Sequence, residues 1–248
     1  MRIAERILEY ASRRAGSFHR RELMSDLAAA DVSVASAQMQ LNRLVASGRL
    51  SRTSYGTYEL SANIKMDYHY QSTDEEIALS RLIRGKFPFV DFCVWKPSAL
   101  VPFMQHIPAL SMVLVDVERV AMESVFHFMQ SQQHYRPVLL NPSPQECDRY
   151  ITTERIFIVR PLISESPLED IDGVRVPTLE KMLVDAAGDK ELAFAQGAEL
   201  YTICSNAHAA HHVSTRRLLR YASRRNRKQL MLKILKTITP RQHDTPRQ

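Results

Sequence analysis

Residues 33–60, SVASAQMQLNRLVASGRLSRTSYGTYEL, decide the fold expected for the first part of the chain. Ser33 is a suitable helix N-cap, and Gly48 can end the helix that follows it. Polar and apolar residues alternate on either side of Gly56, which predicts a β-hairpin over 49–60. Helical spacing of the apolar residues predicts that the helix buries Val34, Ala37, Leu41, Leu44 and Val45.

Two shorter helices are expected before this segment. Apolar residues at helical spacing predict a first helix from Ile3 and a second over 20–30. Three helices followed by a hairpin are the element order of a winged helix-turn-helix, whose third helix fits the major groove of DNA. The sequence therefore predicts a DNA-binding domain over residues 1–66. The same domain could instead serve protein contacts or dimerisation, and the pattern leaves that alternative open.

The face of the third helix opposite its buried stripe should contact DNA. Serine and glutamine can hydrogen-bond to base edges, and arginine can bind guanine or a phosphate. Arginines at the hairpin could also hold backbone phosphates. The residues predicted to bind DNA are Ser36, Met39, Gln40 and Arg43 on the helix, with Arg49 and Arg52 at the hairpin.

Charge is unevenly distributed along the chain, whose formal net charge is +6. Residues 1–66 hold ten Lys/Arg and six Asp/Glu, residues 67–214 hold twelve and twenty, and residues 215–248 hold eleven and one. The basic ends predict contact with a polyanion. The sequence has no apolar run long enough to span a bilayer and no signal-peptide core, and its three cysteines form no disulfide pattern. We therefore expect a cytoplasmic protein without membrane contact.

Residues 67–238 are expected to form an α/β domain that ends in basic helices. Residues 68–72 should be a linker, Thr178 should cap a further helix, and residues 239–248 should be a disordered tail. The expected fold is thus mixed α and β: an N-terminal winged helix-turn-helix, an α/β domain and a helical C-terminal region. Strand candidates, which alternate with helix candidates, lie over 87–95, 112–117, 137–140 and 156–159.

An enzymatic alternative rests on acids of the middle segment. Asp91, Asp116 and Glu118 with Lys96 could form the carboxylate–lysine set of a Mg²⁺-dependent nuclease that a winged helix directs to DNA. Their spacing matches no recognised nuclease pattern, and the sequence has no phosphate-binding glycine loop and no serine- or zinc-hydrolase motif. We therefore expect a protein that is not an enzyme and needs no cofactor.

Cys204, His208, His211 and His212 have spacings that could place three zinc ligands on one helix face. A fourth ligand at zinc-finger spacing is missing, and cysteine and histidine are also ordinary structural residues. We expect no bound metal at these positions.

The segment after these histidines is strongly basic. It could bind phosphates of nucleic acid or an acidic partner surface. Alternatively, it could pack on the acidic middle domain with its arginines paired there, and the sequence leaves both interpretations open. The residues concerned are Arg216, Arg217, Arg220, Arg224, Arg225, Arg227 and Lys228.

Three stretches of the chain carry a family resemblance. They are LNRLV at 41–45 with Gly48 and GTY at 56–58, then VPTLEKMLVD at 176–185, then LRYASRR at 219–225. In this order they resemble the AbiEi-like antitoxins of type IV toxin–antitoxin systems, which are bacterial transcriptional regulators with an N-terminal winged helix.

The resemblance implies an antitoxin that counters an AbiEii-like nucleotidyltransferase toxin without requiring a stable complex with it. It also implies repression of its own promoter through inverted repeats in double-stranded DNA, with Ser36, Gln40 and Arg43 contacting the DNA and Arg49 and Arg52 on the wing. The first 66 residues carry a charge of only +4. That is modest for tight binding by a monomer and compatible with a homodimer on DNA.

The resemblance also draws attention to Glu180, Lys181 and Asp185, which match its second motif. Two interpretations are open for these residues. They could serve the antitoxin function, or they could form a salt-bridge network at a helix start that builds the fold.

Overall fold

The structure, a computed structural model, describes residues 3–14, 16–30, 32–61, 65–109, 111–152 and 154–238. The chain packs into two compact units, Met1–Asp67 with Ala209–His212, and Tyr68–His208 with Val213–Gln248. The tail at 239–248, expected to be disordered, lies outside the described residues. None of the described helices is long and apolar enough to cross a membrane.

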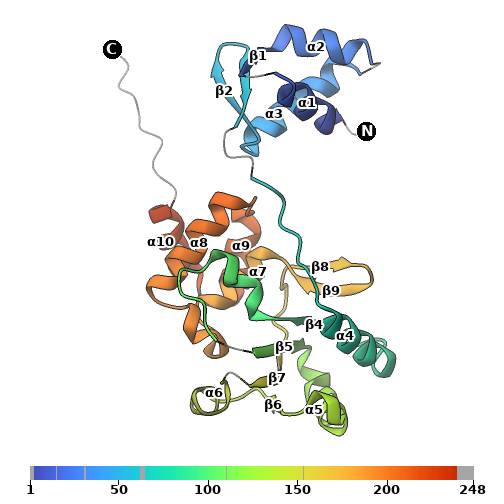
Figure 1. Cartoon of the computed structure of the whole chain (residues 1–248), viewed down its shortest axis with the longest axis vertical. Coiled ribbons are helices and arrows are strands. Elements are labelled where there is room, and N and C mark those ends of the chain that lie inside the picture. The colour runs from blue at the N-terminus through green and yellow to red at the C-terminus, as the bar shows by residue number, and fades with distance from the viewer. Residues whose placement is uncertain are drawn as a thin grey trace. The chain divides into compact units, whose positions relative to one another are not determined.

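The first unit contains three helices and a small antiparallel sheet with strand order β1-β3-β2 (Figure 1). The expected helices and hairpin are present, and β1 is an additional strand that the sequence did not indicate. The identification of this unit as a winged helix-turn-helix stays a prediction. Its elements are α1 (Ile3–Ser12), β1 (Ser17–His19), α2 (Arg20–Ala28), α3 (Val34–Ala46), β2 (Leu50–Ser54) and β3 (Thr57–Leu60).

Local signals in the sequence position α3. The hydroxyl of Ser33 accepts a hydrogen bond from the backbone N–H of Ser36, as an N-cap does. Gly48 follows the helix with a φ of +72°, a conformation that favours glycine. The helix buries Ala37, Leu41 and Leu44 against α1 and α2, as expected.

Val34 does not belong to the buried stripe, so that prediction is wrong. Its side chain is 55% exposed. Val34 is the first residue of α3, and Val32 in the preceding turn packs against the core instead. Helical spacing places a residue on a face, but it does not show where along the helix the neighbouring elements stop covering that face.

The second unit is built on a four-stranded mixed sheet with strand order β4-β5-β7-β6. β5 runs parallel to β7, β7 runs parallel to β6, and β4 is antiparallel to β5. Together with the first unit this gives the expected mixed α and β fold. The strands are β4 (Phe92–Trp95), β5 (Ser111–Val117), β6 (Val138–Leu140) and β7 (Arg155–Pro161), with a separate hairpin of β8 (Leu168–Ile171) and β9 (Val174–Pro177).

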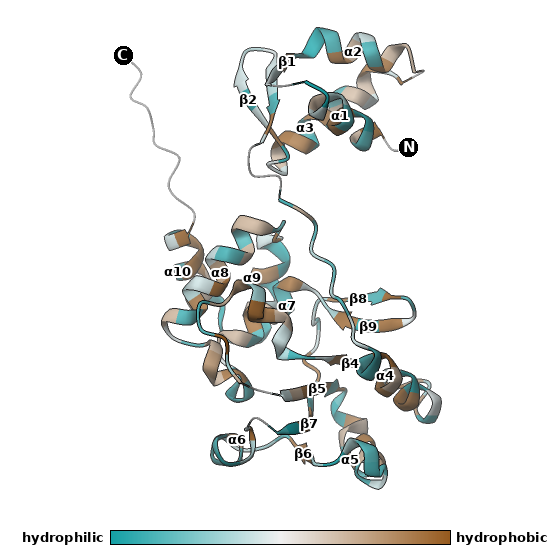
Figure 2. Ribbon diagram, in the orientation of Figure 1, coloured by the Kyte–Doolittle hydropathy of each residue, from teal (hydrophilic) through white to brown (hydrophobic). Residues whose placement is uncertain are grey.

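Helices cover both faces of this sheet, and the C-terminal part of the unit is helical (Figure 1). One face packs against α4 and α5, and the other packs against α7 to α10. Strands β4 and β5 are coloured mostly as hydrophobic in Figure 2, which fits burial on both sides. The helices are α4 (Asp74–Lys86), α5 (Met122–Ser131), α6 (Pro144–Tyr150), α7 (Leu179–Ala186), α8 (Ala198–Ala210), α9 (Thr215–Arg224) and α10 (Lys228–Ile238).

One further expectation for this unit is wrong in its bounds, and another is incomplete. The strand expected over 87–95 begins only at Phe92, because residues before it end α4 and leave Phe89 almost fully exposed. The expected linker at 68–72 forms no helix or strand and begins at the boundary between the two units, but it contains Tyr70, which is buried in the core. Its hydroxyl donates to Glu76 and accepts from the backbone N–H of Lys96 at 2.8 Å. The polar composition of this segment gave no sign that one of its aromatic side chains is part of the core.

Candidate functional site

The first candidate site is the exposed face of α3. Since α3 buries Ala37, Leu41 and Leu44, its opposite face points away from the core of the first unit. A helix surface of this kind, free of core contacts, is what major-groove recognition requires. The exposed residues of this face are Ala35, Met39, Asn42, Arg43 and Ala46.

Only part of this face could be predicted from the sequence. Met39 and Arg43 are exposed as expected, whereas Ser36 and Gln40 are half-buried on its flanks. The Ser36 hydroxyl also accepts a hydrogen bond from Ser33 at 2.9 Å. Asn42 was missed, although it lies beside Arg43. Its Oδ1 accepts a hydrogen bond of 2.9 Å from Gln38, and this contact orients the amide.

The hairpin next to α3 carries the expected arginines in two different environments. Arg52 is exposed, and its guanidinium lies 5.6 Å from the ring centre of Tyr55, which is 92% exposed at the turn. Arg49 is half-buried, with its Nε out of contact with solvent. Arg52 is therefore better placed than Arg49 to meet a ligand outside the unit.

The second candidate site is a buried cluster of charged side chains in the second unit. It arises from the two-residue period of the strands. Cys93 and Trp95, Met112 and Leu114, and Ile156 and Ile158 all point to the face covered by α7 to α10. The next positions on that face are Asp116 of β5 and Arg160 of β7, which are paired in the parallel register.

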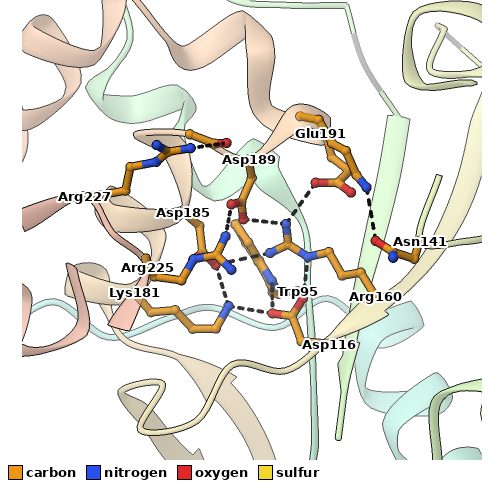
Figure 3. Close-up of polar contacts among 12 residues, drawn as sticks. Trp95, Asp116, Asn141, Arg160, Lys181, Asp185, Asp189, Glu191, Arg225 and Arg227 are labelled. Atoms are coloured by element: carbon orange, nitrogen blue, oxygen red, sulfur yellow. Dashed lines mark hydrogen bonds and ion pairs between the residues drawn. The ribbon is translucent and has the colours of Figure 1, made fainter. Parts of the chain in front are cut away.

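Asp116 and Arg160 bind each other at the centre of this cluster (Figure 3). Arg160 Nε donates to Asp116 Oδ1 at 2.5 Å, and Trp95 Nε1 donates to Asp116 Oδ2 at 3.0 Å. The two terminal nitrogens of Arg160 reach three more carboxylates. These are Asp185 at 3.1 Å, Asp189 at 2.7 Å and Glu191 at 3.3 Å.

Helix α7 contributes the cation that completes the centre. Lys181 Nζ lies 2.5 Å from Asp116 Oδ2 and 2.6 Å from Asp185 Oδ2, and the lysine side chain is 1% exposed. Helix α9 adds Tyr221, whose hydroxyl donates to Asp185 at 2.9 Å. Arg225, which follows α9, pairs with Asp189. The motifs VPTLEKMLVD and LRYASRR, far apart in sequence, therefore meet in one cluster.

Glu180 faces away from this centre. It accepts a hydrogen bond of 2.8 Å from the backbone N–H of Ser214 and pairs with Arg217 at 3.4 Å. Thr178 occupies the expected N-cap position of α7, but its hydroxyl makes no capping hydrogen bond. The observed contacts of Glu180, Lys181 and Asp185 are those of a salt-bridge network that joins α7 to the sheet and to the C-terminal helices. A role in an antitoxin function stays a prediction.

Burial and charge act in opposite directions on the ionisable groups of the cluster. Burial by itself raises the pKa of Asp116, but the charges of Arg160 and Lys181 outweigh it and lower that pKa to about 2. Burial lowers the pKa of Lys181, and the charges of Asp116 and Asp185 raise it above its ordinary value. Arg225 differs, because burial leaves its pKa below the ordinary value despite the nearby Asp185.

The proposed nuclease residues do not gather in one place. Asp91 pairs with Arg175 at 2.7 Å, and Lys96, beyond the other end of β4, pairs with Glu75 at 2.8 Å. Asp116 is held in the buried cluster, and Glu118 accepts a hydrogen bond from the backbone of Asp91. Within the described part of the chain, no group of three or more His, Cys, Asp or Glu side chains could hold a metal ion.

The cysteine and histidines near residue 204 make contacts of a structural kind. Cys204 is fully buried in the core, and the Nδ1 atom of His208 lies 2.8 Å from its backbone oxygen. His211 Nδ1 lies 3.2 Å from the backbone oxygen of Met66. His212, which follows, is half-buried.

The basic C-terminal segment is largely paired within the second unit. Arg220 and Arg224 both bind Glu165, and Arg227 donates to the backbone oxygen of Gly188 at 3.3 Å. With the contacts of Arg217 and Arg225, five of the seven basic residues hold groups of the acidic domain. Arg216 and Lys228 are exposed. The observed arrangement is thus a segment packed on the acidic middle domain with its arginines paired there. DNA contact by this segment stays a prediction.

The chain matches the model of a known protein family. The model of DUF6577, described as a family of unknown function, matches residues 36–241, and the chain therefore belongs to this family. No curated protein matches the chain. The match begins within α3 and extends past α10, so it includes every residue of the buried cluster but only part of the first unit.

Proposed function

We propose that this member of DUF6577 is a DNA-binding transcriptional autoregulator that uses its first unit to bind inverted repeats in its own promoter. One observation carries the proposal. Helix α3 presents Met39, Asn42 and Arg43 on a face that its own core does not use. Arginine can bind guanine through two hydrogen bonds, asparagine can do the same with adenine, and methionine can contact a thymine methyl group.

Exposed arginines near the hairpin support the same function. Arg20 and Arg21 are exposed at the start of α2, where the N–H of Arg20 bonds to the backbone oxygen of Gly56 in the hairpin turn, and Arg52 is exposed on the hairpin itself. Cations beside a recognition helix can hold phosphates and fix its register in the groove. A first unit that carries few such cations favours binding as a homodimer on two half-sites, since each dimer doubles the phosphate contacts.

The second part of the proposal is that the protein acts as an antitoxin against a nucleotidyltransferase toxin. It rests on the resemblance of three stretches to AbiEi-like antitoxins. Two of these stretches meet in the buried cluster, which supports a second unit with the same fold as in AbiEi-like antitoxins. This unit would counter the toxin without forming a stable complex with it. Neither activity requires a cofactor or makes the protein an enzyme.

The DNA-binding part is tested with Arg43→Ala in the full chain, measured by fluorescence anisotropy on the protein's own promoter. Loss of one base contact should weaken binding by about 1–3 kcal/mol, or roughly 5- to 150-fold. Arg13→Ala is the matched control, because Arg13 is an exposed arginine of the same unit and directly follows α1, away from α3 in sequence. Equal affinities for promoter and scrambled DNA would refute the proposal, as would equal losses in the two variants.

The antitoxin part is tested separately by co-expression with the toxin encoded next to the gene. Arg43→Ala should relieve repression of a promoter reporter while cells still survive the toxin. Death of cells that contain soluble wild-type protein would refute the antitoxin part and leave the DNA-binding part standing.

A further inference from the structure

A small open cavity lies against the buried cluster, inside the second unit. Its volume is about 220 Å³. It opens where β5, β6 and β7 end, because Asp116 and Arg160 lie near the ends of β5 and β7, and Asn141 directly follows β6. In open α/β sheets, ligands bind at the carboxyl ends of the parallel strands. The position of the cavity is therefore that of a ligand site.

The charges around the cavity are poorly explained by stability alone. Burying ion pairs costs about as much free energy as their attraction returns, so apolar side chains of similar volume would stabilise the fold as well. Charged groups do create a polar wall with fixed geometry, and sites that bind polar ligands need such a wall. The cluster is the innermost part of that wall.

The inner wall and the rim of the cavity differ in charge balance. In the inner wall, Asp116, Asp185 and Asp189 each bind one or more cationic side chains. At the rim, Lys190 donates to the neutral amide oxygen of Asn141 at 3.1 Å. The inner carboxylates, among them Glu191 at 3.3 Å from Arg160, are thus each paired with a cation, whereas Lys190 at the rim has a neutral partner.

Arg225 also lines the cavity, where its guanidinium pairs with Asp189. A guanidinium has five N–H donors, so this ion pair leaves donors of Arg225 for a further acceptor.

The rim groups have one hydrogen-bonding property in common. The ammonium of Lys190 and the guanidinium of Arg225 are donors only. Because the Asn141 carbonyl oxygen accepts from Lys190, its amide N–H₂ group is left to donate. A ligand made of acceptors with negative charge matches such a rim, and a phosphate group has both properties.

We propose that this cavity binds the phosphate group of a small phosphate ester. Its volume lies below the roughly 300–1,000 Å³ of pockets that enclose drug-sized molecules. The cavity therefore encloses the phosphate and the first atoms attached to it, and the rest of the ester extends to solvent through the open side. This site is independent of the DNA-binding face of α3.

The experiment titrates the full chain with inorganic phosphate, ribose 5-phosphate and ribose at constant ionic strength. Trp95, the single tryptophan, reports on the site because it binds Asp116 of the inner wall. We expect saturable fluorescence changes with ribose 5-phosphate at a Kd of about 1 mM or below, and none with ribose. If inorganic phosphate saturates the signal and ribose 5-phosphate does not, the proposal that the ligand is an ester is overturned. If ribose and ribose 5-phosphate give equal responses, the proposal that the site recognises the phosphate group is overturned.

Variants at the rim separate this site from a general charge effect. Lys190→Gln should weaken ribose 5-phosphate binding by about 5-fold or more, and Lys86→Gln, an exposed lysine on α4, should change it less than 2-fold. Asn141→Asp, nearly equal in shape, replaces a donor with a negative charge and should abolish binding. Stronger binding in Asn141→Asp, or equal losses in the two lysine variants, would overturn the proposal.

Discussion

Replacing Lys181 with methionine should destabilise the second unit strongly. Methionine is similar in length and apolar, so the change removes the charge and leaves the packing volume nearly intact. Lys181 Nζ lies within 2.6 Å of carboxylate oxygens of both Asp116 and Asp185, and all three side chains are at most 2% exposed. Breaking a buried pair by removing one partner costs about 3–5 kcal/mol, because the remaining charge stays buried without compensation.

The loss is measured by urea unfolding of the full chain, followed by the fluorescence of Trp95, which lies in the second unit. Lys86→Met is the control, since Lys86 is exposed and should contribute less than about 0.5 kcal/mol. A loss below about 1 kcal/mol for Lys181→Met would refute the reasoning, because Arg160 would then suffice to hold both carboxylates.

The pH dependence of the same variant tests the electrostatic argument. The pKa of Asp116 is about 2 in the folded chain, below its ordinary value of 3.8. A lowered pKa contributes stability that is fully present above pH 3.8 and is lost as the pH falls towards 2. The difference corresponds to about 2 kcal/mol. In Lys181→Met the folded pKa should rise, so the pH at which stability is lost should also rise.

The remaining predictions use substitutions whose structural contexts differ sharply. Leu41→Ala should cost the first unit about 2–5 kcal/mol, whereas Val34→Ala should change its stability by less than about 0.5 kcal/mol, both measured by far-ultraviolet circular dichroism during thermal unfolding. Tyr70→Phe should cost about 1–3 kcal/mol in the Trp95 transition, since it removes the hydrogen bond to Oε1 of Glu76 and leaves the N–H of Lys96 without a partner, while Thr73 still binds Oε2 of Glu76. The triple change Arg224→Gln, Arg225→Gln and Arg227→Gln should lower the melting temperature and leave the salt dependence of DNA binding unchanged, because these arginines are paired within the second unit. A flatter salt dependence with an unchanged melting temperature would instead support phosphate contacts by these arginines.

Local patterns in the sequence were enough to predict the three helices and the hairpin of the first unit, but not strand β1. The cap at Ser33, the glycines at 48 and 56 and the helical spacing around Leu41 each act within a few residues, and the structure has the helices and the hairpin there. The pattern could not show that Val34 is exposed or that Asn42 lies on the outer face. Those facts depend on which neighbouring elements cover α3.

The cluster around Arg160 could not be predicted in the same way. From the sequence, Asp116, Lys181, Asp185 and Arg225 belonged to three separate hypotheses: a nuclease site, an antitoxin motif and phosphate contacts. Arg160 was missed, although an arginine within the apolar run RIFIVR at 155–160 is the one signal that could have drawn attention to it.

The local elements, the segregation of charge and the residue types of two motifs follow from the order of the amino acids alone. The tertiary fold is needed to place Asp116 and Arg160 opposite each other on parallel strands, and to bring Lys181 of α7 and Tyr221 of α9 to the same place. The physical reason is the distance along the chain over which each kind of interaction acts. Caps, turns and helical faces are set by neighbours within one or two turns, whereas a buried ion cluster depends on strand register and on the packing of segments up to about a hundred residues apart.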